Sequence, residues 1–134
     1  WHGANFQNAR KVLPLFDQGM SALIDDLHER GLNNDVSVVA WGEFGRTPKF
    51  NANGGRDHWG HVFSVALAGG GIRGGTVYGA SDRDAAFPLE GRVEPKDLIA
   101  TIFHCLGYRP DTEIHDAFGQ PFPISRGEVI RQIL

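Results

Sequence analysis

The chain has 134 residues, of which 41% are hydrophobic and 22% are charged, and its formal net charge is −3. This composition argues against a disordered chain, and no apolar run approaches the ~20 residues that a membrane-spanning helix needs. The acidic balance argues against a nucleic-acid partner, because no basic field is available to hold phosphates along a groove. A small anionic substrate stays compatible with this charge, since a bound metal ion can supply positive charge locally.

The first predicted element is an amphipathic helix over residues 11–30. Apolar side chains recur there at three- and four-residue spacing from Val12 to Leu27, and acidic side chains occupy the other face. Proline is tolerated in the first turn of a helix, so Pro14 predicts that the regular helix begins near it. Gly31 is a typical residue for the end of a helix.

Two nearly continuous apolar runs follow, at residues 36–41 and 62–68. Such runs are typical of strands that are buried on both faces. The glycine-rich segment 69–75 lacks the Lys-Ser/Thr of a phosphate-binding loop and predicts a turn that ends the second strand. Residues 76–78 are then expected to form a short edge strand.

A second helix is predicted over residues 95–106, closed by Gly107. Cys105, the only cysteine, lies in its apolar run and is expected to be a buried structural thiol. Residues 108–126 are expected to be irregular, and residues 127–134 to form a last short helix. Buried strands that alternate with helices predict an α/β layered architecture.

The segment 42–61 is expected to be a long loop between the two buried strands. A loop of this length is unusual in a compact domain and is usually functional. Asp and His are suitable ligands for divalent metal ions, and Arg binds phosphate or sulfate oxygens in a fork. The loop contains Glu43, Arg46, Lys49, Arg56, Asp57, His58 and His61. The alternative is a solvated connector; the position of Asp57 and His58 between two strands favours a site.

The remaining histidines are weighed individually. His2 is either an inert residue near a chain end or a site residue that precedes the first helix. His61 adjoins the second strand and either contributes to the site or only hydrogen-bonds to backbone. Three further histidines have no clustered partner and are interpreted as structural: His28, His104 and His115.

Several motifs in combination resemble a bacterial family known as domain of unknown function 1501. They are His-Gly-Ala-Asn at 2–5, Leu-Phe-Asp-Gln-Gly-Met-Ser-Ala-Leu at 15–23, Gly-Glu-Phe-Gly-Arg-Thr-Pro at 42–48, Gly-Arg-Asp-His-Trp at 55–59 and Leu-Ala-Gly-Gly-Gly-Ile-Arg-Gly-Gly at 67–75. That family is related to sulfatases and to the alkaline phosphatase superfamily. The resemblance implies a layered α/β fold of that type, with a mainly parallel sheet flanked by helices. It also implies that residues 1–134 are the C-terminal portion of one such domain, without the N-terminal half that carries the nucleophile.

The resemblance further implies a divalent metal ion, either zinc, calcium or manganese, held partly by His2, Glu43 and His58. Phe44 occupies the position of a metal-binding histidine of the superfamily, which is a departure from the pattern. Nothing in the chain matches the nucleophile, so no catalytic residue is assigned. Anion binding, or support of the metal ligands, is expected of Arg46, Arg56, Asp57 and His61.

By resemblance, the expected function is metal-dependent hydrolysis of a sulfate or phosphate ester, with a small anionic ester as substrate. The alternative is a non-catalytic, sulfatase-like binding or scaffold module. Related proteins commonly carry twin-arginine signals, which implies an exported or periplasmic protein. Residues 1–134 alone are expected to be inactive and to bind metal weakly. The sequence leaves the oligomeric state open.

Overall fold

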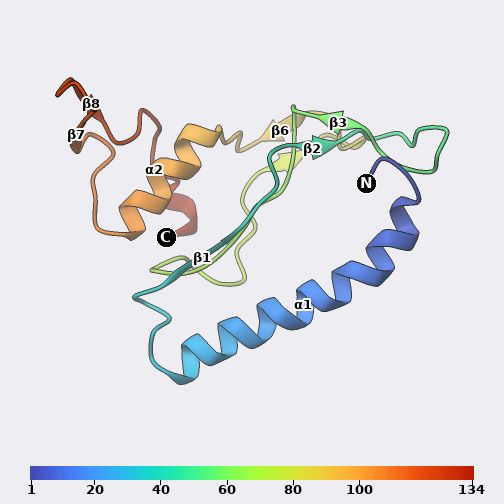
Figure 1. The fold of residues 1–134 in the computed structure, drawn as a ribbon, viewed down its shortest axis with the longest axis horizontal. Helices are drawn as coiled ribbons and strands as arrows, with labels where there is room; N and C mark the ends of the chain where they lie inside the picture. The colour runs from blue at the N-terminus through green and yellow to red at the C-terminus, as the bar shows by residue number, and fades with distance from the viewer.

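The computed structural model describes all of residues 1–134, which form two α-helices, eight short strands and one 3₁₀ turn (Figure 1). The elements in chain order are α1 (Asn5–Glu29), β1 (Ser37–Ala40), β2 (Gly45–Arg46), β3 (His58–Trp59), β4 (Ala66–Gly69), β5 (Ala80–Ser81), β6 (Pro88–Glu90), α2 (Pro95–Cys105), β7 (Glu113–His115), β8 (Pro121–Pro123) and η1 (Arg131–Ile133). The strands pair as β1–β4, β2–β3, β5–β6 and β7–β8, and every pair is antiparallel.

The prediction of a mainly parallel, layered sheet flanked by helices is therefore wrong. β1 pairs with β4 in antiparallel register, with Ser37 opposite Gly69 and Ala40 opposite Ala66. β2 follows β1 and β3 precedes β4, and β2 and β3 also pair with each other. Residues 37–69 therefore form one long hairpin that contains two separate ladders. A parallel pair needs a crossover connection, usually through a helix, and the chain between β1 and β4 contains no helix.

The strands are also shorter and less buried than their apolar runs suggest. All four residues of β1 are only half-buried, and the second run forms a strand only at Ala66–Gly69. The turn predicted at the glycine-rich segment is confirmed, because Gly69, Gly70 and Gly71 all have positive φ. The edge strand predicted at residues 76–78 is wrong, since the strand lies at Ala80–Ser81.

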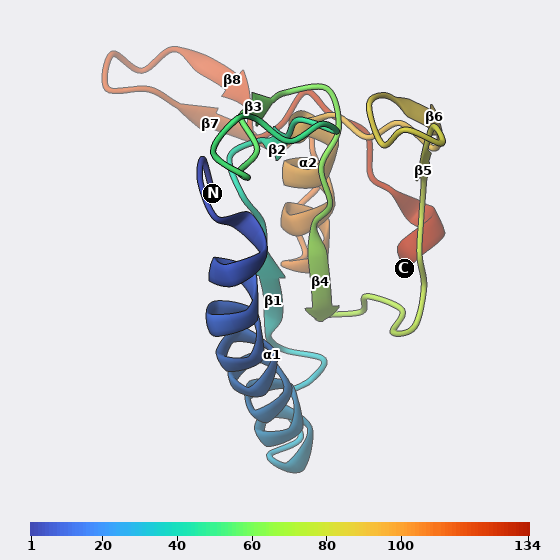
Figure 2. The same cartoon turned by 90° about the vertical axis from the view of Figure 1, so that its right-hand side faces the viewer.

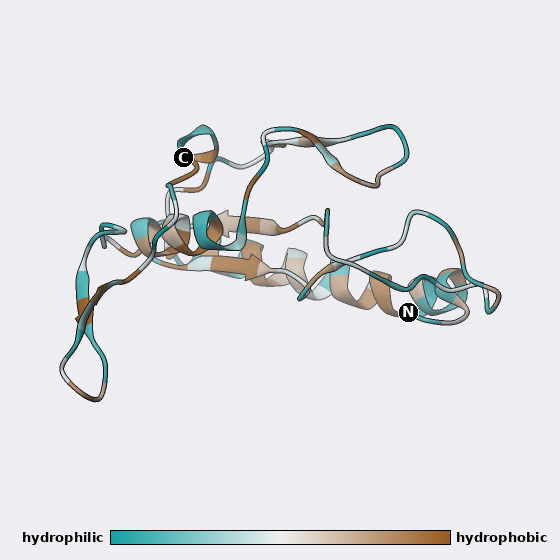
Figure 3. Ribbon diagram, turned by 90° about the horizontal axis from the view of Figure 1, so that it is seen from above, coloured by the Kyte–Doolittle hydropathy of each residue, from teal (hydrophilic) through white to brown (hydrophobic).

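α1 is confirmed as a helix, but it begins at Asn5, so Pro14 lies inside it. The expectation that the helix begins near Pro14 is wrong. Gly31, with φ of 71°, follows the end of the helix as expected. None of the residues of α1 is buried, and Leu13, Leu15 and Phe16 are each more than half exposed. Figures 1 and 3 show α1 beside the β1–β4 pair, with apolar segments along its length.

The small buried core lies between α2 and the C-terminal segment. α2 begins at Pro95 behind a capping box in which the Glu94 amide donates to Asp97, and it ends before Gly107, as predicted. The buried residues of this region are Leu98, Ala100, Thr101, Ile130 and Ile133. The predicted last helix is a single 3₁₀ turn, and the half-buried Cys105 closes α2.

Residues 108–126, expected to be irregular, contain the β7–β8 hairpin, which projects from the molecule beyond α2 (Figures 1 and 2). None of the helices is long and apolar enough to span a membrane. The N-terminus lies beside the β2–β3 hairpin in both views, so the first residues approach the loop between β2 and β3.

Candidate functional site

The N-terminal segment is held on the loop between β2 and β3 by backbone hydrogen bonds. The Ala4 amide donates to Asn53 O at 3.0 Å, and the Arg56 amide donates to Trp1 O at 2.9 Å. Gly3 and Gly54 form an antiparallel bridge between the two segments. Gly55 allows this close approach, because a Cβ there would lie 2.1 Å from the carbonyl carbon of His2. These contacts bring His2 to a loop more than fifty residues away in sequence.

The β2–β3 ladder positions the second part of the site. The segment 42–61 is therefore not the structureless loop that the sequence suggests. Arg46 lies directly opposite His58, and Gly45 lies opposite Trp59. Side chains of directly opposed residues project from the same face of a ladder, so Arg46 and His58 share a face. Gly45 has no space for a Cβ, which would lie 2.0 Å from Val62 O.

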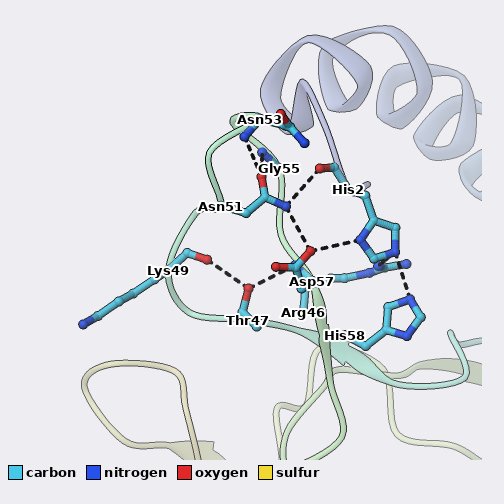
Figure 4. Close-up of polar contacts among 9 residues, drawn as sticks. All are labelled: His2, Arg46, Thr47, Lys49, Asn51, Asn53, Gly55, Asp57 and His58. Atoms are coloured by element: carbon cyan, nitrogen blue, oxygen red, sulfur yellow. Dashed lines mark hydrogen bonds and ion pairs between the residues drawn. The ribbon is translucent and has the colours of Figure 1, made fainter.

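Four side chains converge at this point, and we call them the His2 cluster: His2, Arg46, Asp57 and His58 (Figure 4). His2 Nδ1 lies 3.1 Å from Asp57 Oδ1, and His2 Nε2 lies 2.9 Å from His58 Nε2. The Arg46 guanidinium lies 3.3 Å from His2 Nε2. The cluster joins the N-terminal segment, β2 and β3 at a single point.

The protonation pattern of the cluster follows from its geometry. An ionised carboxylate only accepts hydrogen bonds, so the proton between His2 and Asp57 belongs to His2 Nδ1. Hydrogen bonds from Asn51 and His2 lower the pKa of Asp57, which favours the ionised form. In neutral His2 the lone pair is then on Nε2, and it points toward His58 and Arg46. The His2 and Asp57 side chains are 59% and 57% exposed, so the cluster is accessible from solvent.

Aromatic side chains border the cluster on one side. The ring of Phe44 contacts the ring of His58, with a centroid distance of 4.2 Å, and the Arg46 guanidinium lies 5.6 Å from the centroid of Phe44. Phe44 therefore limits the directions from which a ligand can reach the imidazole of His58.

The other predicted site residues lie outside the cluster. Glu43 is exposed, and no hydrogen bond or ion pair joins it to His2 or His58. Arg56 donates to Thr47 O and Pro48 O, both at 2.7 Å, and its guanidinium lies 4.2 Å from the centroid of the Phe50 ring. The Arg56 guanidinium therefore holds the loop together.

His61 is placed in a separate aromatic group. Its ring lies 4.8 Å from that of Trp59 and 4.9 Å from that of Phe87, and the Trp59 indole donates to Ala86 O at 2.6 Å. This group connects β3 to the β5–β6 hairpin. Of the three histidines interpreted as structural, His115 pairs with Glu113 at 3.3 Å across one face of β7.

Sequence reasoning missed Asn51, whose side chain contacts both His2 and Asp57. The signal that could have found it is the Asn51-Ala-Asn53-Gly54 segment, since Asn side chains in such turns hydrogen-bond to nearby backbone amides. No group of three or more His, Cys, Asp or Glu side chains in the structure is arranged to hold a metal ion. The His2 cluster therefore offers two imidazole rings, and the carboxylate of Asp57 is hydrogen-bonded to the ring of His2.

The chain is thus a small α/β structure built from antiparallel hairpins. Its candidate binding site is polar and exposed, and consists of two imidazoles, a carboxylate and a guanidinium. The chain belongs to the family described as "Protein of unknown function (DUF1501)", whose model matches residues 1–134. Comparisons with curated proteins and with solved structures found no match.

Proposed function

We propose that the His2 cluster binds a divalent metal ion and that the protein hydrolyses a sulfate or phosphate ester there. One observation carries the proposal: the Nε2 atoms of His2 and His58 lie 2.9 Å apart, while Nδ1 of His2 is hydrogen-bonded to Asp57. Metal-binding histidines typically donate their other ring N–H to a carboxylate or a carbonyl. The motifs resemble the family of domain of unknown function 1501, and the relation of that family to sulfatases and alkaline phosphatases supports the same proposal.

The cluster offers two imidazole nitrogens to a small divalent cation. Nitrogens that hold one zinc ion tetrahedrally at ~2.0–2.1 Å would lie about 3.4 Å apart. His2 Nε2 and His58 Nε2 lie at the hydrogen-bond distance of 2.9 Å, so the two rings would move apart slightly to hold an ion. Zinc, manganese and calcium are the candidate ions, and the imidazole nitrogens favour zinc or manganese over calcium.

Arg46 supplies the anion-binding group in this proposal. Arg46 is a half-buried residue opposite His58 on the β2–β3 ladder, and its guanidinium lies beside His2 Nε2. A planar guanidinium binds two oxygens of a sulfate or phosphate group at once. An ester oxygen bound beside the His2 cluster would thus meet the positive charge of the Arg46 guanidinium.

A divalent ion at this point would polarise a phosphoryl or sulfuryl oxygen and lower the pKa of a bound water. The residues of the chain contribute position and charge. His2 and His58 would hold the ion through Nε2, Asp57 would keep the His2 ring in orientation, and Arg46 would neutralise charge that develops on the ester oxygens. Glu43 is exposed beside β2 and could join the ligands only after a change in the position of its side chain.

The experiment is a metal titration of the full-length protein with zinc, manganese and calcium, followed by assays on aryl sulfates and aryl phosphates. His58→Ala should abolish metal binding and turnover, whereas the control His61→Ala should preserve both. Arg46→Met should raise the KM for the ester while metal affinity is retained. A protein that binds none of the three ions, or a His58→Ala variant with unchanged turnover, would refute the proposal.

A second candidate function is a non-catalytic binding or scaffold module of an exported protein. The observation that favours it is the Phe44 ring, which lies 4.2 Å from His58 where the resemblance expects a further metal-binding histidine. In this case His2, Asp57 and His58 would bind a ligand by hydrogen bonds alone. Phe44→His separates the two candidates, because it should strengthen metal binding in a metal site and weaken ligand binding in a module. Fractionation of cells that express the protein tests the export.

We also propose that residues 1–134 form the C-terminal portion of one larger α/β domain. The chain exposes 9661 Å² and only 7 of its 134 residues are buried. A compact domain of 14.7 kDa would expose about 6,900 Å². The excess of about 2,700 Å² on this chain is of the size that an extensive permanent interface covers.

The exposed surface of the chain has apolar side chains and unpaired strand edges, which are features of such an interface. α1 exposes Phe6, Leu13 and Phe16, and the β1–β4 pair has two unpaired outer edges. Hydrogen exchange on the full-length protein tests the proposal: the amides of β1 that face away from β4 should be protected there and should exchange rapidly in residues 1–134 alone. Equal exchange in both would contradict it.

A further inference from the structure

The side chain of Asn51 uses all of its hydrogen-bonding capacity at the His2 cluster (Figure 4). Its Nδ2 donates to the carbonyl oxygen of His2 and to Asp57 Oδ1, both at 3.0 Å. Its Oδ1 accepts hydrogen bonds from the amides of Asn53 and Gly55, also at 3.0 Å. An amide side chain has two donor hydrogens and two acceptor lone pairs, so every one is engaged.

Asp57 is fixed from both sides by these contacts. Its Oδ1 receives hydrogen bonds from Asn51 and from His2, and its amide donates to Thr47 Oγ1 at 3.1 Å. The Thr47 amide in turn donates to Asp57 O at 2.9 Å. The backbone and the carboxylate of Asp57 are thus both held, which leaves Oδ1 pointing at the imidazole of His2.

We propose that Asn51 and Asp57 are positioning residues that hold His2 as the Nδ1–H tautomer, with the lone pair of Nε2 directed at His58 Nε2 and the Arg46 guanidinium. Asn51 fixes the backbone of His2 through its carbonyl oxygen, and Asp57 fixes the ring through Nδ1. Which nitrogen of a histidine carries the proton is set by the hydrogen bond that the other nitrogen makes. The role of Nε2 as a metal ligand rests on the proposed function, whereas the tautomer does not.

Asn51 could instead be a purely structural residue of the turn at residues 51–55. The two roles differ in what they predict for His2. A structural residue would affect the stability of the loop and leave the tautomer of His2 unchanged. A positioning residue affects the tautomer and the affinity of Nε2 for a cation.

The test uses nitrogen-15 NMR of histidine-labelled protein without metal, followed by zinc titration. Wild-type His2 should carry its proton on Nδ1. Asp57→Asn, which keeps the shape of the side chain, and Asn51→Ala should each shift His2 toward the Nε2–H form and weaken zinc binding by about 10- to 100-fold, the usual effect of losing a partner behind a ligand. Asn53→Ala is the matched control, because the side chain of Asn53 makes no hydrogen bond.

The amide signals of the β1–β4 ladder show whether each variant keeps its fold. An Nε2–H tautomer in the wild-type protein, or a tautomer that is unchanged in folded Asp57→Asn, would overturn the inference. The inference and the proposed function fail separately. If the wild-type protein has the Nδ1–H tautomer and the variants shift it, but zinc, manganese and calcium do not bind, then the positioning role stands and the metal function is refuted.

Discussion

The hydroxyl of Thr101 joins the C-terminal segment to α2: its Oγ1 accepts a hydrogen bond from the Ile130 amide at 2.9 Å and donates one to Asp97 O at 2.7 Å. Thr101 is completely buried. A buried backbone amide without an acceptor lowers the stability of the fold. By accepting from the Ile130 amide, the Thr101 hydroxyl therefore stabilises the contact between α2 and the C-terminal segment.

Thr101→Val should destabilise the protein by about 1–3 kcal/mol, because the Ile130 amide loses its acceptor in a buried place. Thr101→Ser is the matched control. It keeps both hydrogen bonds and loses one methyl group, which costs about 1 kcal/mol. Urea unfolding of the three proteins measures the difference. A valine variant as stable as the serine variant would show that the hydroxyl contributes little.

Asp97 supports the same region from the start of α2. Its Oδ2 accepts a hydrogen bond from the Glu94 amide and its Oδ1 accepts one from the Glu128 amide, both at 2.9 Å. Asp97→Ala should cost about 0.5–2 kcal/mol, the range for loss of a capping side chain. Lys96→Ala removes only an exposed ion pair with Glu94 and should have a small effect. Thermal unfolding that ranks the two variants in the reverse order would contradict the capping role.

Pro14 lies inside α1, where it cannot donate to the carbonyl of Arg10. Pro14→Ala should therefore increase the helix content, and the local gain is about 3 kcal/mol in a helix interior. Gly19→Ala is a milder comparison, since a Cβ there meets nothing and the gain is about 1 kcal/mol. Circular dichroism measures both. A loss of helix in Pro14→Ala would mean that the proline shapes α1 for a contact.

Cys105 is expected to react slowly, because burial raises the pKa of its thiol and so lowers the fraction of reactive thiolate. Alkylation with iodoacetamide at about pH 8 should be slower in the folded protein than in urea. The difference should narrow as the pH rises through the raised pKa. Because the unfolded thiol ionises at a lower pH than the folded one, rising alkalinity also reduces the free energy of unfolding. Equal rates in both states would contradict the burial of the thiol.

α2 could be predicted from sequence almost completely, because its signals are local. Pro95 at the first position, Asp97 three residues after Glu94 and Gly107 beyond the end are all adjacent to the helix that they define. The start of α1 could not be predicted in this way, since a proline inside a helix is indistinguishable in sequence from one in the first turn.

The direction of the strands depends on information that an apolar run does not contain. The run at 36–41 predicts a strand whichever way its partner runs. Only the register, with Ser37 opposite Gly69 and Ala40 opposite Ala66, shows that β1 and β4 are antiparallel. The ladder of β2 and β3 has only two residues in each strand, too few for any alternation.

The residue types of the site could be predicted from sequence, but the contacts between these residues could not. Asp57 and His58 are adjacent in the chain and easily noticed. Backbone hydrogen bonds between residues 1–5 and 53–56 bring His2 to them, and no local sequence pattern predicts these bonds. Asn51 looks like an ordinary turn residue until its amide is seen between His2 and Asp57.

Gly55 carries no functional group, yet its lack of a side chain is what allows His2 to lie against the loop. Its tolerance to substitution should therefore match that of the histidines of the His2 cluster. In a saturation-mutagenesis experiment selected for function, position 55 should be as restricted as positions 2 and 58. Gly60, where a Cβ meets nothing, should accept many residues. A glycine can thus be as informative a marker of this site as a histidine.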